Sequence, residues 1–578
     1  MRRLSLVLTL AVLGAATVAG AAGTGDLAQK AGPSGCISDT GAGPCIDGTG
    51  LDGATSVTIS PDGKNAYAAS GSNVVAIFDR SSDGTLVQKS GIAGCISDTG
   101  EGPCADGSAL DGASSVTVSP DGSNVYVTSS FTSSAVAVFD RAADGTLSQK
   151  PGPAGCISDR GDPPCVQGRG LSAATAVTLS PDGRSAYVTG SAGSDAVAVF
   201  DRAADGTLTQ KPGTAGCISE FGTGPCADGT GLSAASSVTV SPDGRSAYVT
   251  AASSDTVDVF DRSADGTLTQ KPGTAGCISD SGAGPCTDGQ ALIGASSVTV
   301  SPDGTSAYVA SLMRGRDFTD GAVAVFDRAA DGTLTQKPGA AGCIADNGAA
   351  PCADGTGLVG ARSVTVGPEG SSVYVASNIS AAVAVFDRGA DGTLAQKPGT
   401  SGCISDSGAG PCTDGTGLDG AASVTVSPDG ASVYAASFVS DAVSVFDRAA
   451  GAPPPVYPPA VDAAAPELSA LSLSPARFRA AHAGASVTER TRRGARVSFR
   501  LSERAKVRFM VQRAGHRHRT VRGSFVRRAA EGLNRFAFTG RLRGRALRPG
   551  RYRLRAVATD QAGNASRVVR RRFRIVRR

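Results

Sequence analysis

Histidine is the scarcest functional side chain of this 578-residue chain, with only three copies, and all of them lie after residue 466. The first 466 residues therefore offer no imidazole, which is the commonest general base and a usual ligand of zinc. Glutamate is nearly as rare there, and no nucleophile beside a base can be named. These absences argue against a catalytic site in that part of the chain. The histidines are His482, His516 and His518, and the glutamates are Glu101, Glu220 and Glu369.

Long hydrophobic runs are also missing, with one exception at the N-terminus. An apolar run over residues 4–18 follows two arginines and ends in Ala-Gly-Ala at 19–21, which is the pattern of a secretory signal with its cleavage site. No second hydrophobic span follows, so we expect no transmembrane segment. Residues 1–21 are predicted to be a signal peptide, and the mature protein is expected to be secreted or held at the cell surface.

What the chain does contain is one motif written seven times. The first cysteines of successive copies are separated by 59, 61, 61, 60, 66 and 60 residues. A fixed period of this size indicates a repeat architecture. Because the copies are nearly identical, they offer little of the asymmetry that an active site needs. The first cysteines are Cys36, Cys95, Cys156, Cys217, Cys277, Cys343 and Cys403.

Each copy contains four short runs of alternating polar and apolar residues. In the fourth copy these runs cover 237–240, 246–250, 256–260 and 267–271, and Ser241-Pro242-Asp243-Gly244 separates the first two. Such alternation is typical of half-buried strands, and Pro-Asp-Gly is typical of a tight turn. No amphipathic helical pattern occurs in the repeats. Four hairpin-linked strands per copy predict one blade of a β-propeller.

The seventh copy lacks its last strand, and a matching segment stands before the first copy. This strand reads Leu-x-Gln-Lys in six copies, whereas the seventh runs from Arg448 into a proline-rich stretch. Because Leu27–Lys30 has the same form, we expect it to complete the last blade and so remove the exposed edges of an open array. Residues 24–448 are therefore predicted to form an all-β, seven-bladed propeller with four-stranded blades.

The motifs SPDG, AYV, AVAVFDR and DGTL recur in this order, and together they resemble the seven-bladed propeller repeats of the lactonase and YVTN type. The resemblance covers about residues 24–450. It implies the propeller fold and, as one alternative for function, a hydrolase similar to 6-phosphogluconolactonase that acts in the central cavity. Since propellers support many functions, the motifs are specific for fold and weakly specific for activity.

All 14 cysteines lie in the repeats, as seven Cys-x8-Cys pairs. Zinc sites use closer pairs or histidines, and reactive thiols are not expected at seven equivalent places. An even count in an exported chain fits disulfides. We expect local pairing within each loop, and pairing between neighbouring blades is the other option. The local pairs would be Cys36 with Cys45, Cys95 with Cys104, Cys156 with Cys165, Cys217 with Cys226, Cys277 with Cys286, Cys343 with Cys352 and Cys403 with Cys412.

Two further repeated features have structural interpretations. Asp79 and Arg80, with their six equivalents, end the third strand and predict a structural ion pair or a turn contact. Loop aspartates such as Asp39 and Asp47 offer the oxygen ligands that calcium prefers, but Asp-Gly is also ordinary turn chemistry. We therefore expect no metal and no cofactor, with calcium as the alternative.

Composition changes after the repeats. Residues 449–466 are rich in proline and alanine and are predicted to be a semi-rigid linker. Residues 467–578 contain 30 arginines and one lysine against five acidic residues, which gives a net charge of +26. Because the whole chain has a net charge of +4, residues 1–466 have a net charge of −22. Alternating strands over 467–578 predict a small β-sandwich. The segment PGRYRLRAVATDQAGN resembles the late strands of bacterial immunoglobulin-like domains, which are mostly adhesion and spacer modules.

The arginines of 467–578 have two interpretations. In the first they occupy solvent-facing strand positions without a partner. In the second they form an electrostatic footprint for an anionic partner, which outside a cell means envelope polymer, anionic lipid headgroups or extracellular DNA. Docking onto the acidic ring is a further possibility. Motifs for specific nucleic-acid recognition are absent, so we expect no specific nucleic-acid partner.

Function is easiest to look for where the repeats differ. The 66-residue step comes from an insertion at 311–320, between the second and third strands, and we expect this loop to share one face with all seven cysteine loops. Other departures fall in the third and fourth cysteine loops, with neutral drift in surface loops as the alternative. The predicted ligand-binding residues are Arg314, Arg316, Asp317, Phe318, Arg160, Asp162, Glu220 and Phe221.

These observations favour a secreted, disulfide-stapled binding or scaffold protein, expected to be a monomer. Its basic C-terminal domain would attach to anionic envelope polymer or to another surface protein. A lactonase-type hydrolase that uses the central cavity is the alternative, and a structural spacer without a ligand is the third hypothesis.

Overall fold

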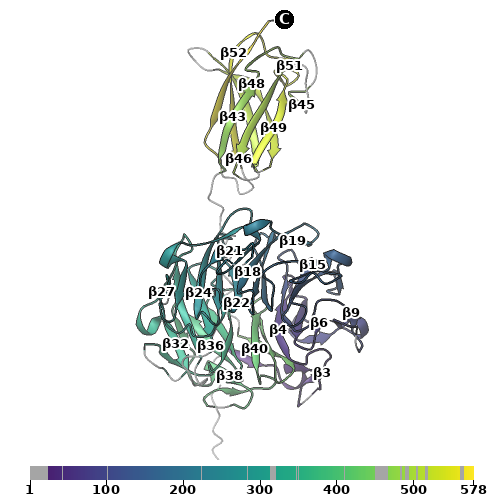
Figure 1. Cartoon of the computed structure of the whole chain (residues 1–578), viewed down its shortest axis with the longest axis vertical. Coiled ribbons are helices and arrows are strands. Elements are labelled where there is room, and N and C mark those ends of the chain that lie inside the picture. Colours follow the sequence, from purple (N-terminus) through teal and green to yellow (C-terminus); the bar gives the residue numbers. More distant parts are fainter. Residues whose placement is uncertain are drawn as a thin grey trace, which may run out of the picture. The chain divides into compact units, whose positions relative to one another are not determined.

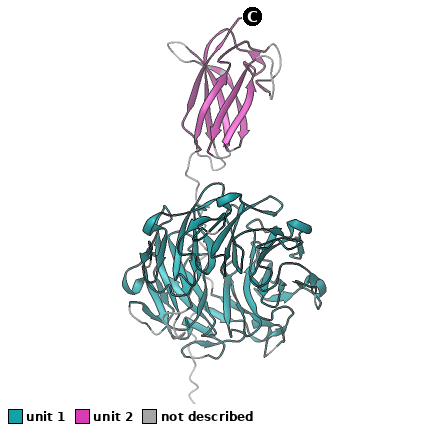
Figure 2. Ribbon diagram, viewed as in Figure 1, with its two compact units in different colours: residues 1–456 teal, residues 457–578 magenta. Residues whose placement is uncertain are grey.

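The computed structural model describes residues 24–449 and 466–577, apart from 42, 101, 223, 283, 313–320, 347, 349–350, 409, 482–484, 489–493, 503–504, 515–518, 531 and 560–564. The chain divides into two compact units, residues 1–456 and 457–578 (Figure 2). The predicted signal peptide and residues 450–465 of the predicted linker lie outside the described residues. Within the described part of the chain, no helix is long and apolar enough to cross a membrane.

The first unit is a propeller of seven β-sheets, each with six strands (Figure 1). The innermost strands of consecutive sheets lie side by side all the way round, including the first against the last, so the sheets close into a ring. We number the blades 1 to 7 by these strands, which are β4 (Ala54–Ile59), β10 (Ala113–Val118), β16 (Ala174–Leu179), β22 (Ala235–Val240), β28 (Ala295–Val300), β34 (Ala361–Val366) and β40 (Ala421–Val426).

The second and third strands of each blade form the buried centre of the sheet. The second strands are β5 (Asn65–Ser70), β11 (Asn124–Ser129), β17 (Ser185–Gly190), β23 (Ser246–Ala251), β29 (Ser306–Ser311), β35 (Ser372–Ser377) and β41 (Ser432–Ser437). The third strands are β6 (Val74–Arg80), β12 (Ala135–Arg141), β18 (Ala196–Arg202), β24 (Thr256–Arg262), β30 (Ala322–Arg328), β36 (Ala382–Arg388) and β42 (Ala442–Arg448).

Outside the third strand the blade is more elaborate than four strands. The Leu-x-Gln strands are β1 (Leu27–Gln29), β7 (Leu86–Gln88), β13 (Leu147–Gln149), β19 (Leu208–Gln210), β25 (Leu268–Gln270), β31 (Leu334–Gln336) and β37 (Leu394–Gln396). Cysteine strands follow them: β2 (Cys36–Ser38), β8 (Cys95–Ser97), β14 (Cys156–Ser158), β20 (Cys217–Glu220), β26 (Cys277–Ser279), β32 (Cys343–Asp346) and β38 (Cys403–Ser405).

The outermost strands are β3 (Ile46–Asp47), β9 (Ala105–Asp106), β15 (Val166–Gln167), β21 (Ala227–Gly229), β27 (Thr287–Asp288), β33 (Ala353–Gly355) and β39 (Thr413–Asp414). A 3-10 helix precedes each cysteine strand: η1 (Gly32–Gly35), η2 (Gly91–Ala93), η3 (Gly152–Ala154), η4 (Gly213–Gly216), η5 (Gly273–Ala275), η6 (Gly339–Ala341) and η7 (Gly399–Gly402).

The fourth strand position is shared by two of these segments. In blade 4, β25 pairs with Phe260–Arg262 at the end of β24, and β26 pairs with Thr256–Asp258 at its beginning. The outermost strand β27 then runs parallel to β26. Each cysteine loop therefore belongs to the preceding blade, beside the turn between the second and third strands. The predicted four-strand frame is present, and the cysteine loop extends it to six.

The Ser-Pro-Asp-Gly turns follow from local chemistry. In blade 4 the Ser241 hydroxyl donates to the Asp243 carboxylate at 2.6 Å and accepts from the Ser246 amide at 3.0 Å. Gly244 adopts a left-handed φ of +68°, which favours glycine. These contacts reverse the chain between β22 and β23 without leaving buried polar groups unpaired.

The ring closes as the displaced Leu-Ala-Gln-Lys segment predicts. Strand β1 pairs with β42 in blade 7, with Leu27 opposite Arg448 and Gln29 opposite Phe446. The segment also completes the boundary between blades 6 and 7, because the Tyr374 hydroxyl donates to the Gly25 carbonyl at 2.8 Å. At the other boundaries the acceptor is a glycine in the turn before the fourth strand, as in Tyr248 to Gly332.

A polar contact set recurs at the blade boundaries. Tyr248 in blade 4 is fully buried, and its oxygen accepts a hydrogen bond from Arg328 Nε of blade 5 at 2.6 Å. Arg328 also pairs with Asp243, the turn aspartate of blade 4, at 3.0 Å. Asp327 pairs instead with Lys337 of its own blade at 2.7 Å. The repeated Asp-Arg therefore makes two separate structural contacts, one within a blade and one between blades.

The second unit is a β-sandwich, as predicted. One sheet has the order β43-β46-β49-β45 and the other β44-β53-β52-β47-β48, and β50 pairs with β51 in a two-stranded sheet. Phe499 and Phe536 of the first sheet and Phe509 of the second meet in one core. The strands are β43 (Leu468–Ser474), β44 (Arg477–Phe478), β45 (Val487–Thr488), β46 (Ala495–Leu501), β47 (Ala505–Arg513), β48 (Arg519–Ala529), β49 (Gly532–Phe538), β50 (Arg541–Leu542), β51 (Arg545–Ala546), β52 (Gly550–Thr559) and β53 (Val569–Ile575).

Candidate functional site

Seven disulfides staple the loops on one face of the ring. Each joins the two cysteines of one loop, across a sequence separation of nine residues, and none joins neighbouring blades. The bonds join Cys36 to Cys45, Cys95 to Cys104, Cys156 to Cys165, Cys217 to Cys226, Cys277 to Cys286, Cys343 to Cys352 and Cys403 to Cys412.

Local pairing, the first of the two predicted options, is thus confirmed, and pairing between neighbouring blades does not occur. The second cysteines of the pairs, Cys45, Cys104, Cys165, Cys226, Cys286, Cys352 and Cys412, all lie just before the outermost strand of their loop. The described part of the chain has no free cysteine. Such disulfides are typical of oxidising compartments. Their task is structural, because each one ties a cysteine strand to the chain that returns beside it.

An acidic side chain in each loop holds the backbone that follows it. Asp39 accepts a hydrogen bond from the Leu51 amide at 2.9 Å, and Asp280 accepts one from Leu292 at 2.9 Å. Glu220, a predicted ligand-binding residue, makes the same contact with the Leu232 amide. The Glu220 carboxylate therefore accepts a hydrogen bond from the loop backbone and stabilises the loop. The Asp39 carboxylate, considered above as a calcium ligand, has the same structural task.

A surface pocket of about 330 Å³ lies between the second and third stapled loops. The third loop contributes Arg160 and Asp162, two of the predicted ligand-binding residues, beside Pro163 and Pro164. The remaining lining residues come from the second and third loops and from the turn between β11 and β12. They are Asp98, Ser108, Ala109, Thr132, Ser133, Ser158 and Cys165. The pocket thus bridges the cysteine loops of blades 1 and 2.

Local contacts fix the walls of this pocket. The disulfide Cys156–Cys165 ties the third loop, and the Cys165 amide donates to the Asp162 carbonyl at 2.9 Å. On the opposite wall, the Thr132 amide donates to the Asp111 carboxylate at 3.0 Å. Because both walls are held by covalent or hydrogen-bonded contacts, the pocket is largely formed before any ligand arrives.

The chemistry of the pocket is polar with a small apolar surface. Arg160 supplies a fixed cation with several donors, Asp98 and Asp162 supply acceptors, and four hydroxyl groups surround them. Two prolines add rigid C–H surface. This combination can hydrogen-bond a ligand rich in hydroxyl groups.

Neither Glu220 nor Phe221, the other predicted ligand-binding residues that the structure describes, lines this pocket. Phe221 stands at the same loop position as Arg160, one loop further on, and is 82% exposed with a left-handed φ of +64°. Arg314, Arg316, Asp317 and Phe318 lie outside the described residues. The Gly321 carbonyl that follows the insertion accepts from the Asp346 amide of the sixth cysteine loop at 3.0 Å, so the end of the insertion lies beside a stapled loop.

Sequence reasoning missed one charge on the innermost strands. Arg362 in β34 stands where the other blades have Ser, Thr or Ala, and it is the extra residue at a β-bulge between Ala361 and Ser363. Its side chain is exposed, yet desolvation by surrounding protein lowers the pKa of its guanidinium. The signal was present in the sequence, because Ala-Arg-Ser-Val replaces the usual Ala-Ser-Ser-Val.

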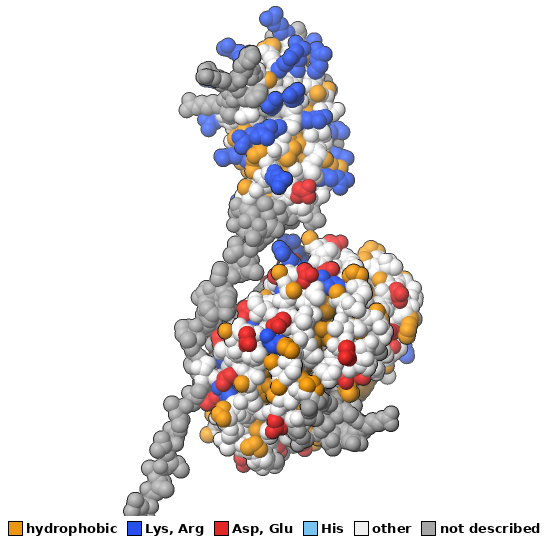
Figure 3. Space-filling view, turned by 90° about the vertical axis from the view of Figure 1, so that its left-hand side faces the viewer, with side chains coloured by type: hydrophobic (Ala, Val, Ile, Leu, Met, Phe, Trp, Pro, Cys, Tyr) orange, Lys and Arg blue, Asp and Glu red, His pale blue; other side chains and the backbone are white. Residues whose placement is uncertain are grey.

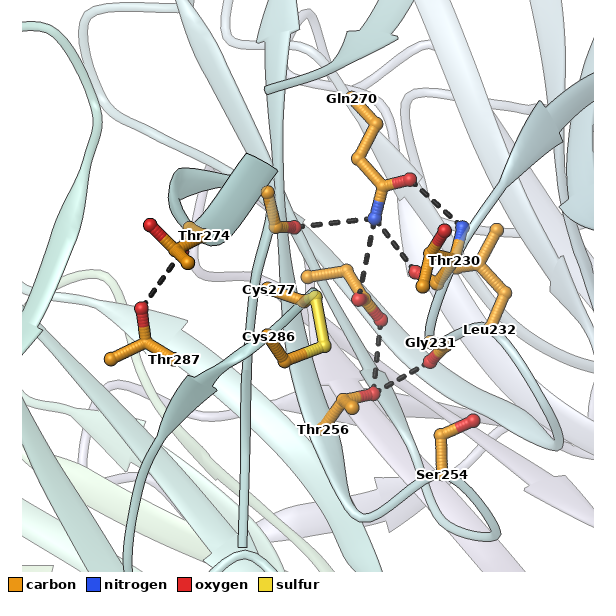
Figure 4. The surroundings of a disulfide bond; sticks show 12 residues. Thr230, Gly231, Leu232, Ser254, Thr256, Gln270, Thr274, Cys277, Cys286 and Thr287 are labelled. Carbon is orange, nitrogen blue, oxygen red and sulfur yellow. Dashed lines mark hydrogen bonds between the residues drawn. A yellow bond between two sulfur atoms is a disulfide. The ribbon is translucent and has the colours of Figure 1, made fainter. Parts of the chain in front are cut away.

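A second missed departure is buried opposite Cys277 of the fifth disulfide, and Figure 4 shows its neighbours Gly231, Thr256 and Gln270. Asp258 in β24 replaces a small residue of the other blades and is completely buried. Thr256 Oγ1 lies 2.6 Å from the Gly231 carbonyl oxygen and 3.1 Å from Asp258 Oδ2, and Gln270 Nε2 lies 3.4 Å from Asp258 Oδ1. Burial, with the charge of Glu220 as a smaller cause, raises the pKa of Asp258 well above its ordinary value.

Across the described residues, no group of three or more histidine, cysteine, aspartate or glutamate side chains is placed to hold a metal ion.

Comparison with known proteins shows no family for this chain. No family model and no curated protein matches the chain. Among solved structures, a putative 6-phosphogluconolactonase from Bacteroides uniformis ATCC 8492 is 20% identical, covers 59% of this chain and 82% of its own, and has a TM-score of 0.41.

Two further structures are similar at the same level. The periplasmic gluconolactonase PpgL of Pseudomonas aeruginosa is 21% identical over 64% of this chain and 93% of its own, with a TM-score of 0.41. Hydrazine synthase of Kuenenia stuttgartiensis is 18% identical, covers 70% of this chain and 98% of its own, and has a TM-score of 0.43.

Proposed function

We propose that this protein is a secreted binding protein whose stapled face holds saccharide units of a cell envelope. The observation that carries the proposal is the pocket in which Arg160 and Asp162 lie against hydroxyl groups and two prolines. Saccharides present hydroxyl groups to polar side chains and C–H faces to apolar ones, which matches this lining. The disulfides and the N-terminal signal pattern support a location outside the cytoplasm.

The second unit fits the same role as an attachment module. We propose that it is an immunoglobulin-like domain, joined through the 449–466 linker, and that its net charge of +26 holds the ring at an anionic envelope. The ring then samples saccharides close to the surface. This division would explain why the ligand pocket and the strong positive charge lie in different units.

The proposal is tested by titrating the mature protein with soluble envelope saccharides in a calorimeter. Arg160→Ala and Asp162→Ala should each weaken binding about 10-fold, as expected for loss of a hydrogen-bonded charge. Arg184→Ala is the matched control, because Arg184 is an exposed arginine in the Ser-Pro-Asp-Gly-Arg turn of blade 3. Equal affinity in all variants, or no binding by the wild type, would reject the pocket and favour a spacer.

One observation favours a second candidate, a lactonase-type hydrolase. Arg362 places a cation on the ring of innermost strands, where it would bind the anionic group of a sugar-acid lactone. Turnover of simple lactones by the purified protein, abolished in Arg362→Ser, would establish this activity. The absence of turnover, with and without a chelator, would reject this candidate.

A further inference from the structure

Arginines face arginines across two neighbouring strands of the second unit. In the register of β52 and β53, Arg551 is opposite Arg574, Arg553 opposite Arg572, and Arg555 opposite Arg570. These six side chains share the outward face of the sheet, since Tyr552, Leu554 and Ala556 between them point into the core. We call this set, Arg551, Arg553, Arg555, Arg570, Arg572 and Arg574, the arginine ladder.

The ladder opposes the stability of the fold. Like charges directly opposite in an antiparallel pair repel one another, and here three such pairs stand in succession. Of the five acidic residues after residue 466, only Glu467 is described, and it precedes β43 in the other sheet. Nε of Arg555 is buried and has no hydrogen-bond partner among the described residues. The repulsion within the ladder is therefore a cost to the folded unit that an anionic partner would relieve.

The cationic surface extends beyond the ladder. Arg477 of β44 lies opposite Arg574, and on the other side β47 contributes Arg508, which is opposite Val557 of β52. Lys506 and Arg528 form the next row. Figure 3 shows one face of the unit, on which blue side chains are frequent. Alternate residues of a strand are about 6.8 Å apart, so the cations form regular rows on the sheet.

We infer that the arginine ladder binds a linear phosphodiester polymer of the cell envelope. This inference rests on the proposed function and specifies which surface attaches the protein. A guanidinium holds a phosphate through two parallel hydrogen bonds, whereas an ammonium acts as a point charge. The unit has 30 arginines and one lysine, which fits this geometry. A polymer with one phosphate per repeat can lie along the rows and contact several of them.

Nucleic acid fits this surface less well. Proteins that bind single strands stack bases on aromatic side chains, but the outward positions beside the ladder are Met510, Gln512, Val526 and Val557. The major groove of a duplex admits a helix or a two-stranded ribbon, and a five-stranded sheet is wider than that. We therefore favour a flexible polymer without bases.

The test measures binding of the full-length mature protein to purified poly(glycerol phosphate). Arg570/Arg572/Arg574→Gln removes one side of the ladder, and Arg496/Arg500/Arg535→Gln removes the same charge from the exposed face of β46 and β49. We expect the first variant to bind at least about 10-fold more weakly and to show a shallower dependence on salt. The second variant should change affinity less than about 3-fold, as expected for long-range charge screened by salt.

Equal losses in the two variants would show that net charge binds the polymer, and would overturn the role of the ladder. Stronger competition by single-stranded DNA, by anionic vesicles or by polyaspartate of equal charge would overturn the phosphodiester polymer as partner. Melting curves of both variants exclude unfolding as the cause. Saccharide binding at the ring, measured on the same variants, should be unchanged, so failure of the ladder and failure of the pocket are separate results.

Discussion

At the scale of single residues, burial controls the titration of Asp258. The Thr256 hydroxyl donates to the Gly231 carbonyl at 2.6 Å. The same hydroxyl also donates to Asp258 Oδ2 at 3.1 Å, which favours the ionised carboxylate. Burial outweighs this contact and raises the pKa of Asp258 well above its ordinary value.

The raised pKa gives a signed dependence of stability on pH. The folded pKa lies above the model value of 3.8, so between the two values the native state holds a proton that the unfolded chain releases. Stability is then fully present below about pH 4 and declines as pH rises towards the folded pKa. Asp258→Asn should match the wild type at pH 4 and gain about 1–3 kcal/mol at pH 8, because its amide can donate to Thr256 without a proton to lose.

Thermal melting of the ring at the two pH values checks this expectation. Asp261→Asn is the matched control, since Asp261 is exposed on the same strand and pairs with Lys271 at 2.7 Å. The control should not reproduce the gain at pH 8. Parallel pH profiles for the wild type and Asp258→Asn would show that Asp258 is ionised in the fold.

At the scale of elements, ring closure depends on one short strand. β1 satisfies the edge of β42, Gly25 accepts from Tyr374, and Lys30 pairs with Asp447 at 2.6 Å. Deleting residues 24–30 should lower the stability of the ring by about 3–6 kcal/mol, because several hydrogen bonds and a buried acceptor are lost together. The readout is the melting temperature of the ring.

A matched variant distinguishes the strand from its position in the chain. When the deleted residues are inserted after Ala449, the strand follows β42 directly, as the fourth strand does in the other blades. We expect this variant to regain most of the lost stability. If deletion has no effect, the last blade does not need β1.

The staples permit a second prediction at this scale. Cys156/Cys165→Ser and Cys403/Cys412→Ser each open one loop, and each should cost about 2–3 kcal/mol. Only the first pair borders the pocket, so only it should weaken saccharide binding, by about 10-fold if the wall becomes mobile. Calorimetric titration of both variants separates a local effect on the pocket from a general loss of stability.

Strands and closure could be predicted because alternation, turn residues and the displaced Leu-Ala-Gln-Lys are local patterns. Pairing of the cysteine strands could not, since three residues such as Cys277–Ser279 carry no periodicity. Arg160 and Asp162 could be proposed from the sequence because they break the repeat. Arg362 breaks the repeat too, but the direction of its side chain is set by a β-bulge, which depends on the register of the strands. Asp258 lies within an ordinary strand pattern, and its burial depends on the neighbouring loop.

At the scale of the whole molecule, charge and function are divided between the units. Residues 1–466 carry −22 and residues 467–578 carry +26, so the small net charge of the chain conceals two strongly charged parts. Repeated, nearly identical blades give a rigid platform, and the departures from the repeat supply its specific chemistry. The pocket at the stapled face and the arginine ladder are therefore expected to bind different partners.

Hydrogen exchange of the ring, with and without a bound envelope saccharide, tests the central claim most directly. The proposed pocket predicts protection confined to 98–109, 132–133 and 158–165, with no change in β34. A footprint on β34 around Arg362 that leaves these three segments unchanged would contradict the pocket and place the ligand in the centre of the ring.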